Sequence, residues 1–436
     1  MLQSPKTAPI RTFRLNCLPE QTPEQTQDVE NLLHLEGYEF IPDDFFPPAR
    51  RLLKEPQPLG LSLAAFFGYI YIQDRSSMLP PVALQPVYGA AVLDICASPG
   101  SKTGQLAGMV GQRGLVLANE PSASRLATLR RNLLIQNLPQ VVSTCQTGES
   151  LPMPDQSWSY IQLDPPCSGW GTLEKNPKVQ ELWSGEKILR LISLQRNLLQ
   201  AAARLLKPGG YLTYSTCTTN VQENEEQIAF CLNTLGLELV ELPNLPGWQL
   251  DTPMMGMTGV WRVNTRPGEN QGFFIAKLRK AQATWAAIST PEPAPALQYT
   301  PIPHNILLES GLDPDSLPGP LGAFAGSVHI LPQKALTMLP DNLRWQGLYC
   351  GKCGKNGEVI LSPRFRVGQD CKQSGPSIQL EGKSGREYLQ KLLQGQSLTT
   401  QAADIQATGK TAALYWNSLP LGRVNLKNNR VLWSER

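Results

Sequence analysis

Short apolar runs alternate with amphipathic stretches between Val87 and Lys280, and this alternation constrains the fold most strongly. The runs predict strands at 91–96, 114–119, 159–163, 211–215 and 272–278, and the stretches predict helices at 104–110, 122–136, 186–206 and 223–232. Such alternation is typical of a mostly parallel sheet covered by helices on both faces. Ligands of these sheets bind beyond the carboxyl ends of the strands. The sequence therefore predicts an α/β domain with its site at that edge.

Segments carrying chemically active side chains follow the predicted strands. They are Cys96, Ala97, Ser98, Pro99, Gly100, Ser101 and Lys102 after the first strand, Asp164-Pro165-Pro166-Cys167 after the third, and Ser215-Thr216-Cys217 after the fourth. Because the carboxyl ends of parallel strands meet at one edge of a sheet, we expect these segments to lie close together.

The first of these segments has the features of a cofactor turn. A glycine turn such as that at Gly100 can present backbone N–H groups and a helix N-terminus to the polar part of a cofactor. Glu120 ends the next strand, where an acidic residue commonly binds ribose hydroxyls. The chain has neither G-x-G-x-x-G nor G-x-x-x-x-G-K-[ST], which disfavours a dinucleotide or a nucleoside triphosphate. S-adenosylmethionine fits such a turn, and an ordinary strand-to-helix turn is the alternative.

The other two segments suggest covalent chemistry on a nucleic-acid base. Two prolines hold Asp164 at the lip of its strand, where a carboxylate can bind the amino and ring-nitrogen edge of a flipped base. Cys217 precedes a predicted helix start, an environment that lowers the pKa of a thiol. A thiolate that adds to a cytosine ring makes the neighbouring carbon 5 nucleophilic toward a methyl group. Cys167 supplies a second acid–base group, although the residues alone leave the roles of the two cysteines open.

The chain resembles the family of RNA cytosine-C5 methyltransferases from about Arg11 to Lys280. The motifs that carry the resemblance are Tyr71-Ile72-Gln73, Ser76-Ser77-Met78, 94–104, Ala118-Asn119-Glu120, 164–172, Lys175-Asn176-Pro177, 205–218, Glu223-Asn224-Glu225 and 271–274. It implies a Rossmann-like, S-adenosylmethionine-dependent methyltransferase fold. It also implies that residues 96–102, Glu120 and Asp164 bind the cofactor.

The same resemblance assigns the cysteines, with Cys217 as nucleophile, Cys167 as the release group and Asp164 as a further catalytic residue. Two positions depart from the family's pattern. Thr147 lies near the place of an aspartate that contacts adenine, and Thr265-Arg266 lies where a Pro-His pair is common.

Four short motifs of the C-terminal part are Tyr388-Leu389, 395–398, Gly422-Arg423 and Leu426-Lys427-Asn428. With them, this part resembles that of the bacterial 16S ribosomal RNA subgroup, which implies a mixed α+β module of the PUA kind. The predicted domains are an RNA-binding N-terminal extension (1–75), the methyltransferase domain (76–282), an Ala- and Pro-rich linker (283–303) and a C-terminal RNA-binding region (304–436). The basic excess of the chain lies in its C-terminal third, which favours an anionic partner there. The expected partner is RNA, most simply 16S ribosomal RNA or a ribosomal subunit particle.

Composition narrows the remaining possibilities. The chain has no apolar run long enough for a membrane helix and no signal peptide, so we expect a cytoplasmic protein that does not bind membranes. Nine cysteines form no disulfide framework. Cys350 and Cys353 are half of a zinc site without the other half, so we expect no metal. A monomer is the expected state.

Alternative functions remain open. An amino methyltransferase uses Asp-Pro-Pro followed by an aromatic residue, whose place Cys167 takes, and it has no use for Cys217. A DNA-type cytosine methyltransferase would make Cys167 the attacking residue. A tRNA cytosine-C5 methyltransferase shares all the motifs, and a methyltransferase-like RNA-binding assembly factor should have lost the cysteines or the cofactor turn.

Overall fold

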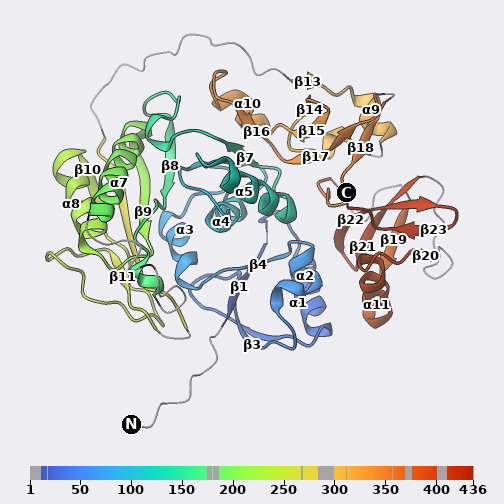
Figure 1. Cartoon of the computed structure of the whole chain (residues 1–436), viewed down its shortest axis with the longest axis horizontal. Coiled ribbons are helices and arrows are strands. Elements are labelled where there is room, and N and C mark those ends of the chain that lie inside the picture. Colours follow the sequence, from blue (N-terminus) through green and yellow to red (C-terminus); the bar gives the residue numbers. More distant parts are fainter. Residues whose placement is uncertain are drawn as a thin grey trace, which may run out of the picture.

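The structure is a computed structural model that describes residues 11–16, 18–173, 179, 186–266, 269–282, 299–310, 312–355, 357–368, 376–399 and 410–435. Most of the predicted linker (283–298) and the motif Lys175-Asn176-Pro177 lie outside the described residues. Figure 1 shows an N-terminal part, a central part and a C-terminal part packed against one another. Among the described residues, no helix is both long and apolar enough to cross a membrane.

The central part is built on a nine-stranded sheet in the order β10-β12-β9-β8-β5-β6-β7-β16, with β11 paired to β12. Five strands run parallel: β5 (Ala91–Asp94), β6 (Leu115–Asn119), β7 (Val141–Thr144), β8 (Trp158–Leu163) and β9 (Leu206–Thr216). Antiparallel pairing adds β12 (Phe273–Lys280), β10 (Leu237–Val240) and β11 (Trp261–Val263). The predicted α/β fold is confirmed, and β7 and β10 are strands that sequence patterning had not found.

Alternating side chains of the strands bury the two faces of this sheet under different helices. Val92 and Val116 pack under α4 (Ser101–Val110) and α5 (Ala123–Gln136). Leu93 and Leu117, one residue further along the same strands, pack under α7 (Glu186–Leu205). On the α7 face α8 (Glu225–Thr234) also contributes to the core. The helix α3 (Leu79–Leu84) packs against β8, β9 and β12 on the opposite face, where Leu84 joins the core under α4 and α5. This two-sided burial explains the continuous apolar runs that identify the strands.

The N-terminal part is a small sheet in the order β2-β3-β1-β4. Its elements are β1 (Thr12–Leu15), α1 (Pro23–Leu35), β2 (Glu39–Pro42), β3 (Ala49–Lys54), α2 (Leu63–Phe66) and β4 (Ile70–Ile72). The chain leaves this sheet past Arg75, whose guanidinium forms a buried ion pair with Asp43 at 2.6 Å. It then enters α3 of the central part through the 3₁₀ turn Ser76–Met78.

The C-terminal part comprises two sheets rather than one module. The first has the order β13-β14-β15-β17-β18 and the second β19-β21-β22-β23-β20. The elements of the first are β13 (Thr300–Pro301), α9 (His304–Glu309), β14 (Leu321–Phe324), β15 (Ser327–Ile330), α10 (Gln333–Met338), β17 (Tyr349–Cys353) and β18 (Val359–Leu361). Those of the second are β19 (Ser377–Leu380), α11 (Gly382–Leu393), β20 (Leu398–Thr399), β21 (Thr411–Trp416), β22 (Leu419–Lys427) and β23 (Arg430–Leu432).

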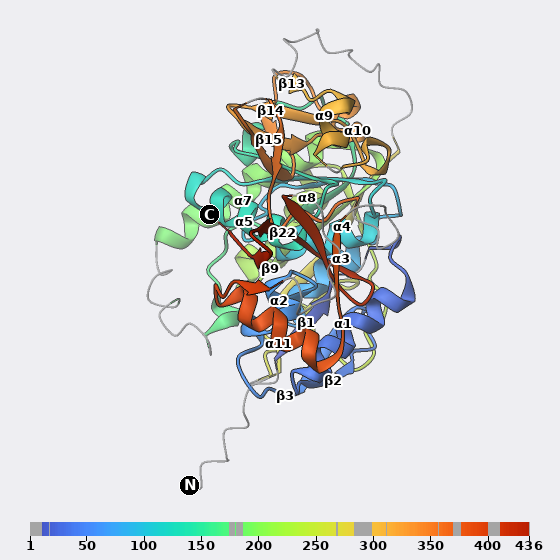
Figure 2. The ribbon, with the colours of Figure 1, turned by 90° about the vertical axis from the view of Figure 1, so that its right-hand side faces the viewer.

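The two C-terminal sheets are anchored at different places. The segment β16 (Trp345–Gln346) adds an antiparallel strand to β7 at the edge of the central sheet. The second sheet instead shares a hydrophobic core with the N-terminal part, to which Phe13, Phe67 and Trp416 contribute. Asp28 of α1 accepts hydrogen bonds from Ser418 N and Oγ at 3.0 and 2.7 Å. In Figure 2, α11 and β22 accordingly lie beside α1 and α2. Likeness to a PUA module stays a prediction.

Candidate active site

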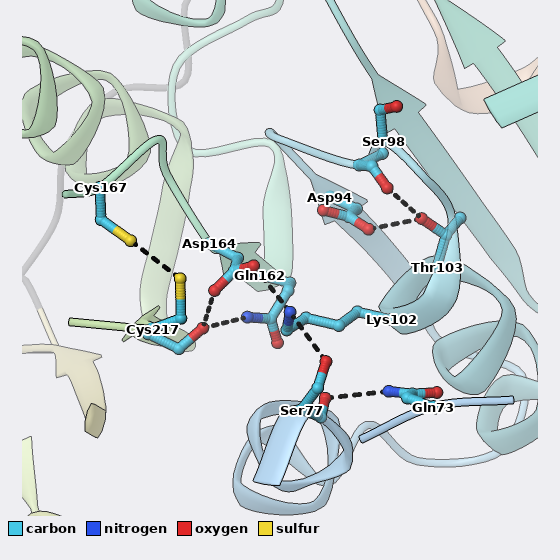
Figure 3. A network of polar contacts seen from close by, with 12 residues as sticks. Gln73, Ser77, Asp94, Ser98, Lys102, Thr103, Gln162, Asp164, Cys167 and Cys217 are labelled. Carbon is cyan, nitrogen blue, oxygen red and sulfur yellow. Dashed lines mark hydrogen bonds and ion pairs between the residues drawn. The ribbon is translucent and has the colours of Figure 1, made fainter. Parts of the chain in front are cut away.

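The carboxyl ends of β5, β8 and β9 bring Asp94, Asp164 and Cys217 to one edge of the central sheet (Figure 3). Asp94 ends β5 and accepts a hydrogen bond from Thr103 Oγ1 of α4 at 2.7 Å. Burial raises the pKa of the Asp94 carboxyl to about 7, although the Thr103 hydrogen bond lowers it. The ends of β5, β8 and β9 therefore lie together in the fold, as the sequence predicted.

Residues 96–100 form a tight turn between β5 and α4, and Ser101 and Lys102 are the first residues of α4. Gly100 has φ +103°, and a Cβ there would lie 2.9 Å from Leu129 Cδ1, so only glycine fits without rearrangement. Asn132 Nδ2 of α5 donates to Pro99 O at 2.8 Å and fixes the outer side of the turn. No side chain caps the N-terminus of α4, so its first backbone N–H groups remain available to a polar ligand.

Glu120, the predicted ribose-binding residue, follows β6 directly. Its side chain is 2% exposed, accepts a hydrogen bond from Ser122 N at 2.9 Å and lies 3.4 Å from Arg125 Nε. The neighbouring Asn119 Nδ2 donates to Ile95 O and Gln146 O at 3.1 and 3.0 Å, which ties together the ends of β5, β6 and β7. Thr147, which departs from the family's pattern, is an exposed residue next to Gln146.

Lys102 connects the cofactor turn with the two cysteine segments. Its ammonium lies 2.7 Å from Asp164 Oδ2, and Ser215 Oγ donates to Asp164 Oδ1 at 2.7 Å. Burial disfavours the Lys102 ammonium, but the attraction of the Asp164 carboxylate outweighs it, and the net pKa of Lys102 is raised. The orientation of the Asp164 side chain is thus fixed from both sides (Figure 3).

The sulfur atoms of Cys167 and Cys217 are 3.2 Å apart, and both residues are partly exposed. A hydrogen bond from Cys167 lowers the pKa of Cys217, to which the Lys102 charge also contributes against burial and Asp164. The same contact, together with burial, raises the pKa of Cys167 well above its ordinary value. When the pair loses one proton, these opposite pKa shifts favour Cys217 over Cys167 as the thiolate.

A buried glutamate that had no role in the sequence analysis holds the two cysteine segments together. Glu223 is fully buried and accepts hydrogen bonds from Ser168 N at 2.9 Å and from Ser168 Oγ at 2.5 Å. It also accepts from Gln195 Nε2 at 2.9 Å and Asn220 Nδ2 at 3.1 Å. Ser168 Oγ in turn lies 2.7 Å from Thr218 Oγ1, next to Cys217. The motif Glu223-Asn224-Glu225 was the available signal, but only the fold shows what its first residue contacts.

A second buried contact fixes the far side of the Cys217 segment. Arg262 of β11 donates to Glu225 Oε1 and to Thr219 O, both at 2.6 Å. Gly171 N donates to Cys217 O at 3.0 Å, and a Cβ on Gly171 would lie 2.4 Å from Gly272 O. Gly171 therefore permits the close approach of the two backbones behind Cys217.

The half zinc motif in the C-terminal part forms no ligand cluster with other described residues. Cys350 and Cys353 both lie in β17, and the turn comes after them rather than between them. Cys350 is fully buried, and burial raises its pKa. No group of three or more His, Cys, Asp or Glu side chains that could hold a metal ion occurs in the described part of the chain. Cys371 lies outside that part.

Comparison with known proteins places residues 81–279 in a family described as 16S rRNA methyltransferase RsmB/F. Ribosomal RNA small subunit methyltransferase F of Shewanella loihica is 34% identical over 67% of this chain and 61% of its own length. The protein of the same name from Salmonella heidelberg is 36% identical over 57% of this chain and 53% of its own. The chain thus spans between about half and three fifths of the length of these curated relatives.

A solved structure shares the fold. The methyltransferase homolog protein from Pyrococcus horikoshii is 31% identical, with a TM-score of 0.54 over 63% of this chain and 87% of its own. The family match over residues 81–279 includes the five parallel strands of the central sheet, and with them the strand ends that carry the cofactor turn, Asp164 and the two cysteines.

Proposed function

The chain belongs to the RsmB/F family of RNA cytosine-C5 methyltransferases, and from this premise we propose that it methylates carbon 5 of a cytosine in small-subunit ribosomal RNA. The methyl donor is S-adenosylmethionine. The observation that carries the proposal is the 3.2 Å contact between the sulfur atoms of Cys167 and Cys217 beside the ion pair of Asp164 with Lys102.

The cofactor turn fits S-adenosylmethionine, which supplies an electrophilic methyl group when it is bound. The uncapped N–H groups of α4 and the turn at residues 96–102 offer donors to its polar part. Glu120 offers a buried carboxylate to the ribose hydroxyls, since one of its oxygen atoms is only loosely paired, at 3.4 Å, with the exposed Arg125. Lys102 and Asp164 lie between this turn and the cysteines.

The proposed reaction assigns a step to each residue at the sheet edge. The Cys217 thiolate adds to the ring carbon next to carbon 5, while Asp164 holds the amino and ring-nitrogen edge of the flipped base. Carbon 5, made nucleophilic by this addition, takes the methyl group. Carbon 5 then loses its proton, the ring double bond re-forms, and Cys217 leaves as a thiolate. Cys167 assists that release.

The electrostatics of the pair favour this assignment over its alternatives. A DNA-type mechanism would need Cys167 as the attacking thiolate, but the pKa of Cys167 is raised and that of Cys217 is lowered. An amino methyltransferase would need no thiolate at all. An assembly factor without activity would have no need of a buried network, centred on Glu223, that keeps the two thiols in contact.

The test of this function is methyl transfer in vitro with three RNA substrates. Purified protein and labelled S-adenosylmethionine are incubated with unmodified 30S subunits, with naked 16S ribosomal RNA and with transfer RNA, and bisulfite sequencing locates the product. We expect 5-methylcytosine at a defined position of the ribosomal substrate. Methylation of transfer RNA alone would make transfer RNA the substrate in place of ribosomal RNA. Methylation of an exocyclic amino group would refute the proposed reaction at carbon 5.

Glu120→Ala is expected to weaken S-adenosylmethionine binding by about tenfold or more. Hydrogen bonds between a carboxylate and ribose hydroxyls contribute about 1.5–3 kcal/mol each, and the variant loses both. Titration calorimetry with the cofactor alone measures the change. Asp155→Ala, at an exposed carboxylate paired with Arg204, is the control and should bind normally. Equal affinity in Glu120→Ala and wild type would contradict the assignment.

The second C-terminal sheet is proposed to bind RNA through exposed basic residues. Lys427 and Arg430 are exposed register partners at the β22–β23 hairpin. Deleting the whole region would uncover the core that it shares with the N-terminal part, so point substitutions are the cleaner test.

The double variant Lys427→Ala/Arg430→Ala should bind RNA more weakly, and the dependence of log affinity on log salt should flatten. With a slope of about −0.7 per phosphate contact for single strands, the expected change in slope is about 1.4. Filter binding at several salt concentrations measures it. Arg113→Ala/Lys207→Ala, near the amino ends of β6 and β9, should leave the slope unchanged. If the wild type and both double variants showed the same slope of log affinity against log salt, the second C-terminal sheet would have a role other than RNA binding.

A ribosomal substrate would be met in the cytoplasm, and we propose that the protein acts there as a monomer. Light scattering of the full chain, alone and with RNA, tests the oligomeric state.

A further inference from the structure

We propose that Cys167 and Cys217 are a peroxide-sensitive dithiol, which a hydroperoxide converts to an intramolecular disulfide that reversibly stops methyl transfer. The inference goes beyond the proposed methylation reaction. It concerns a modification of the free protein, and it requires neither RNA nor S-adenosylmethionine.

The geometry places the two sulfur atoms within reach of a bond. They are 3.2 Å apart, whereas a disulfide needs about 2.05 Å, so the gap to close is about 1.2 Å. Both cysteines lie in loops that follow β8 and β9 rather than inside a helix or strand, and both are partly exposed to solvent. A small oxidant can therefore reach them, and a modest loop adjustment can join them.

The surrounding hydrogen bonds keep the pair together when no substrate is bound. Glu223 binds Ser168, which follows Cys167, and Ser168 lies 2.7 Å from Thr218, which follows Cys217. The loops are thus joined one residue away from each sulfur. This arrangement raises the effective concentration of one thiol at the other, which favours closure of a bridge over independent oxidation.

The pKa values of the two thiols are shifted in opposite directions, as disulfide formation by a peroxide requires. Cys217 has a lowered pKa and lies near the Lys102 ammonium, so it supplies the reactive thiolate, whereas Cys167 keeps its proton. The thiolate attacks one peroxide oxygen, the O–O bond breaks, and hydroxide leaves with a proton to give water and a Cys217 sulfenic acid. Cys167 then attacks that sulfur, the S–O bond breaks, and its thiol proton leaves with the hydroxyl as a second water.

The other cysteines described in the structure provide internal references. Cys231 is fully buried, and burial raises its pKa to about 12, so its thiol should stay unreactive. Cys145 is exposed, and its sulfur contacts Pro121 O at 3.5 Å. Cys145 is therefore open to simple surface oxidation without a resolving thiol, and its replacement by serine removes that reaction from the test.

The consequence follows from the proposed roles of the pair. A bridge consumes the attacking group and the release group in one step, so the oxidised protein should form no adduct with RNA. A dithiol reductant restores both groups. The bridge also protects Cys217 from further oxidation to a sulfinic acid, which would be irreversible.

The test uses the full chain with Cys145→Ser as background, treated with hydrogen peroxide at a small molar excess. Peptide mass spectrometry under non-reducing conditions should find the segment containing Cys167 linked to the segment containing Cys217, and dithiothreitol should separate them. Methyl transfer should fall at least tenfold on oxidation and recover after reduction. Cys167→Ser in the same background should form no bridge and should accumulate sulfinic acid at Cys217.

The mass measurement distinguishes a failure of this inference from a failure of the proposed function. Peroxide-treated protein in which Cys167 and Cys217 stay unlinked, while they are oxidised singly or not at all, would overturn the inference even if the enzyme methylates RNA. A reversible bridge in a protein that methylates no cytosine would support the dithiol and refute the function.

Discussion

Cys167→Ala protein incubated with its RNA and S-adenosylmethionine is expected to accumulate a covalent protein–RNA complex that survives denaturing electrophoresis. The variant keeps the Cys217 nucleophile, so addition and methyl transfer proceed. It lacks the group proposed to assist release, so the adduct persists and turnover falls by at least 10². The band that migrates above free protein on the gel measures the adduct, and ribonuclease treatment should remove it.

Cys217→Ala should give the opposite result, with no adduct and negligible turnover, because no thiolate remains to attack the ring. Cys145→Ala, at an exposed cysteine away from the pair, is the matched control and should behave as wild type. Trapping in Cys217→Ala but not in Cys167→Ala would reverse the two roles. If neither variant forms an adduct and both stay active, covalent catalysis is excluded.

The pH dependence of adduct formation provides an independent check on this assignment. The hydrogen bond from Cys167 is the largest cause of the lowered Cys217 pKa, and burial and Asp164 both oppose it. Removing Cys167 should therefore raise the Cys217 pKa. The rate of adduct formation in Cys167→Ala should rise with pH along a curve shifted to higher pH than the single-turnover methylation rate of wild type.

Asp164→Asn is expected to lower the rate of methyl transfer by about 10²–10³, in the range seen when one preorganised electrostatic group is removed from an active site. The carboxylate pairs with Lys102 at 2.7 Å and accepts from Ser215 at 2.7 Å. The amide of asparagine has only one accepting oxygen, because its NH₂ group is a donor. It therefore cannot accept from Lys102 and Ser215 and also bind the edge of the base. Single-turnover methylation and adduct trapping should fall together.

Ser215→Ala is the matched control for that change. It removes one hydrogen bond from Asp164 but keeps the carboxylate and its ion pair with Lys102, so we expect a loss of only about tenfold, in keeping with about 1.5 kcal/mol for one hydrogen bond to a charged group. Circular dichroism should show that both variants fold. An Asp164→Asn enzyme as active as Ser215→Ala would remove Asp164 from the proposed chemistry.

Much of the central fold could be predicted because its signals are local. Apolar runs at Ala91, Leu115 and Trp158 are long enough to identify strands buried on both faces, and glycine at position 100 identifies the turn. The strands β7 and β10 escaped this reasoning because their sequences, Val-Val-Ser-Thr and Leu-Glu-Leu-Val, contain no continuous apolar run longer than two residues. Pairing with neighbours, rather than their own pattern, makes them strands.

The sequence by itself determined which residues reach the sheet edge, since alternating strands and helices require the segments after β5, β8 and β9 to meet there. Tertiary structure alone decided that the sulfur atoms of Cys167 and Cys217 come into contact, that Glu223 joins their loops, and that the C-terminal region contains two separately anchored sheets. Burial, pKa and shared cores depend on groups far apart in the chain, such as Asp164 and Lys102 or Phe13 and Trp416. Local patterns carry no information about such contacts, which exist only once the chain has folded.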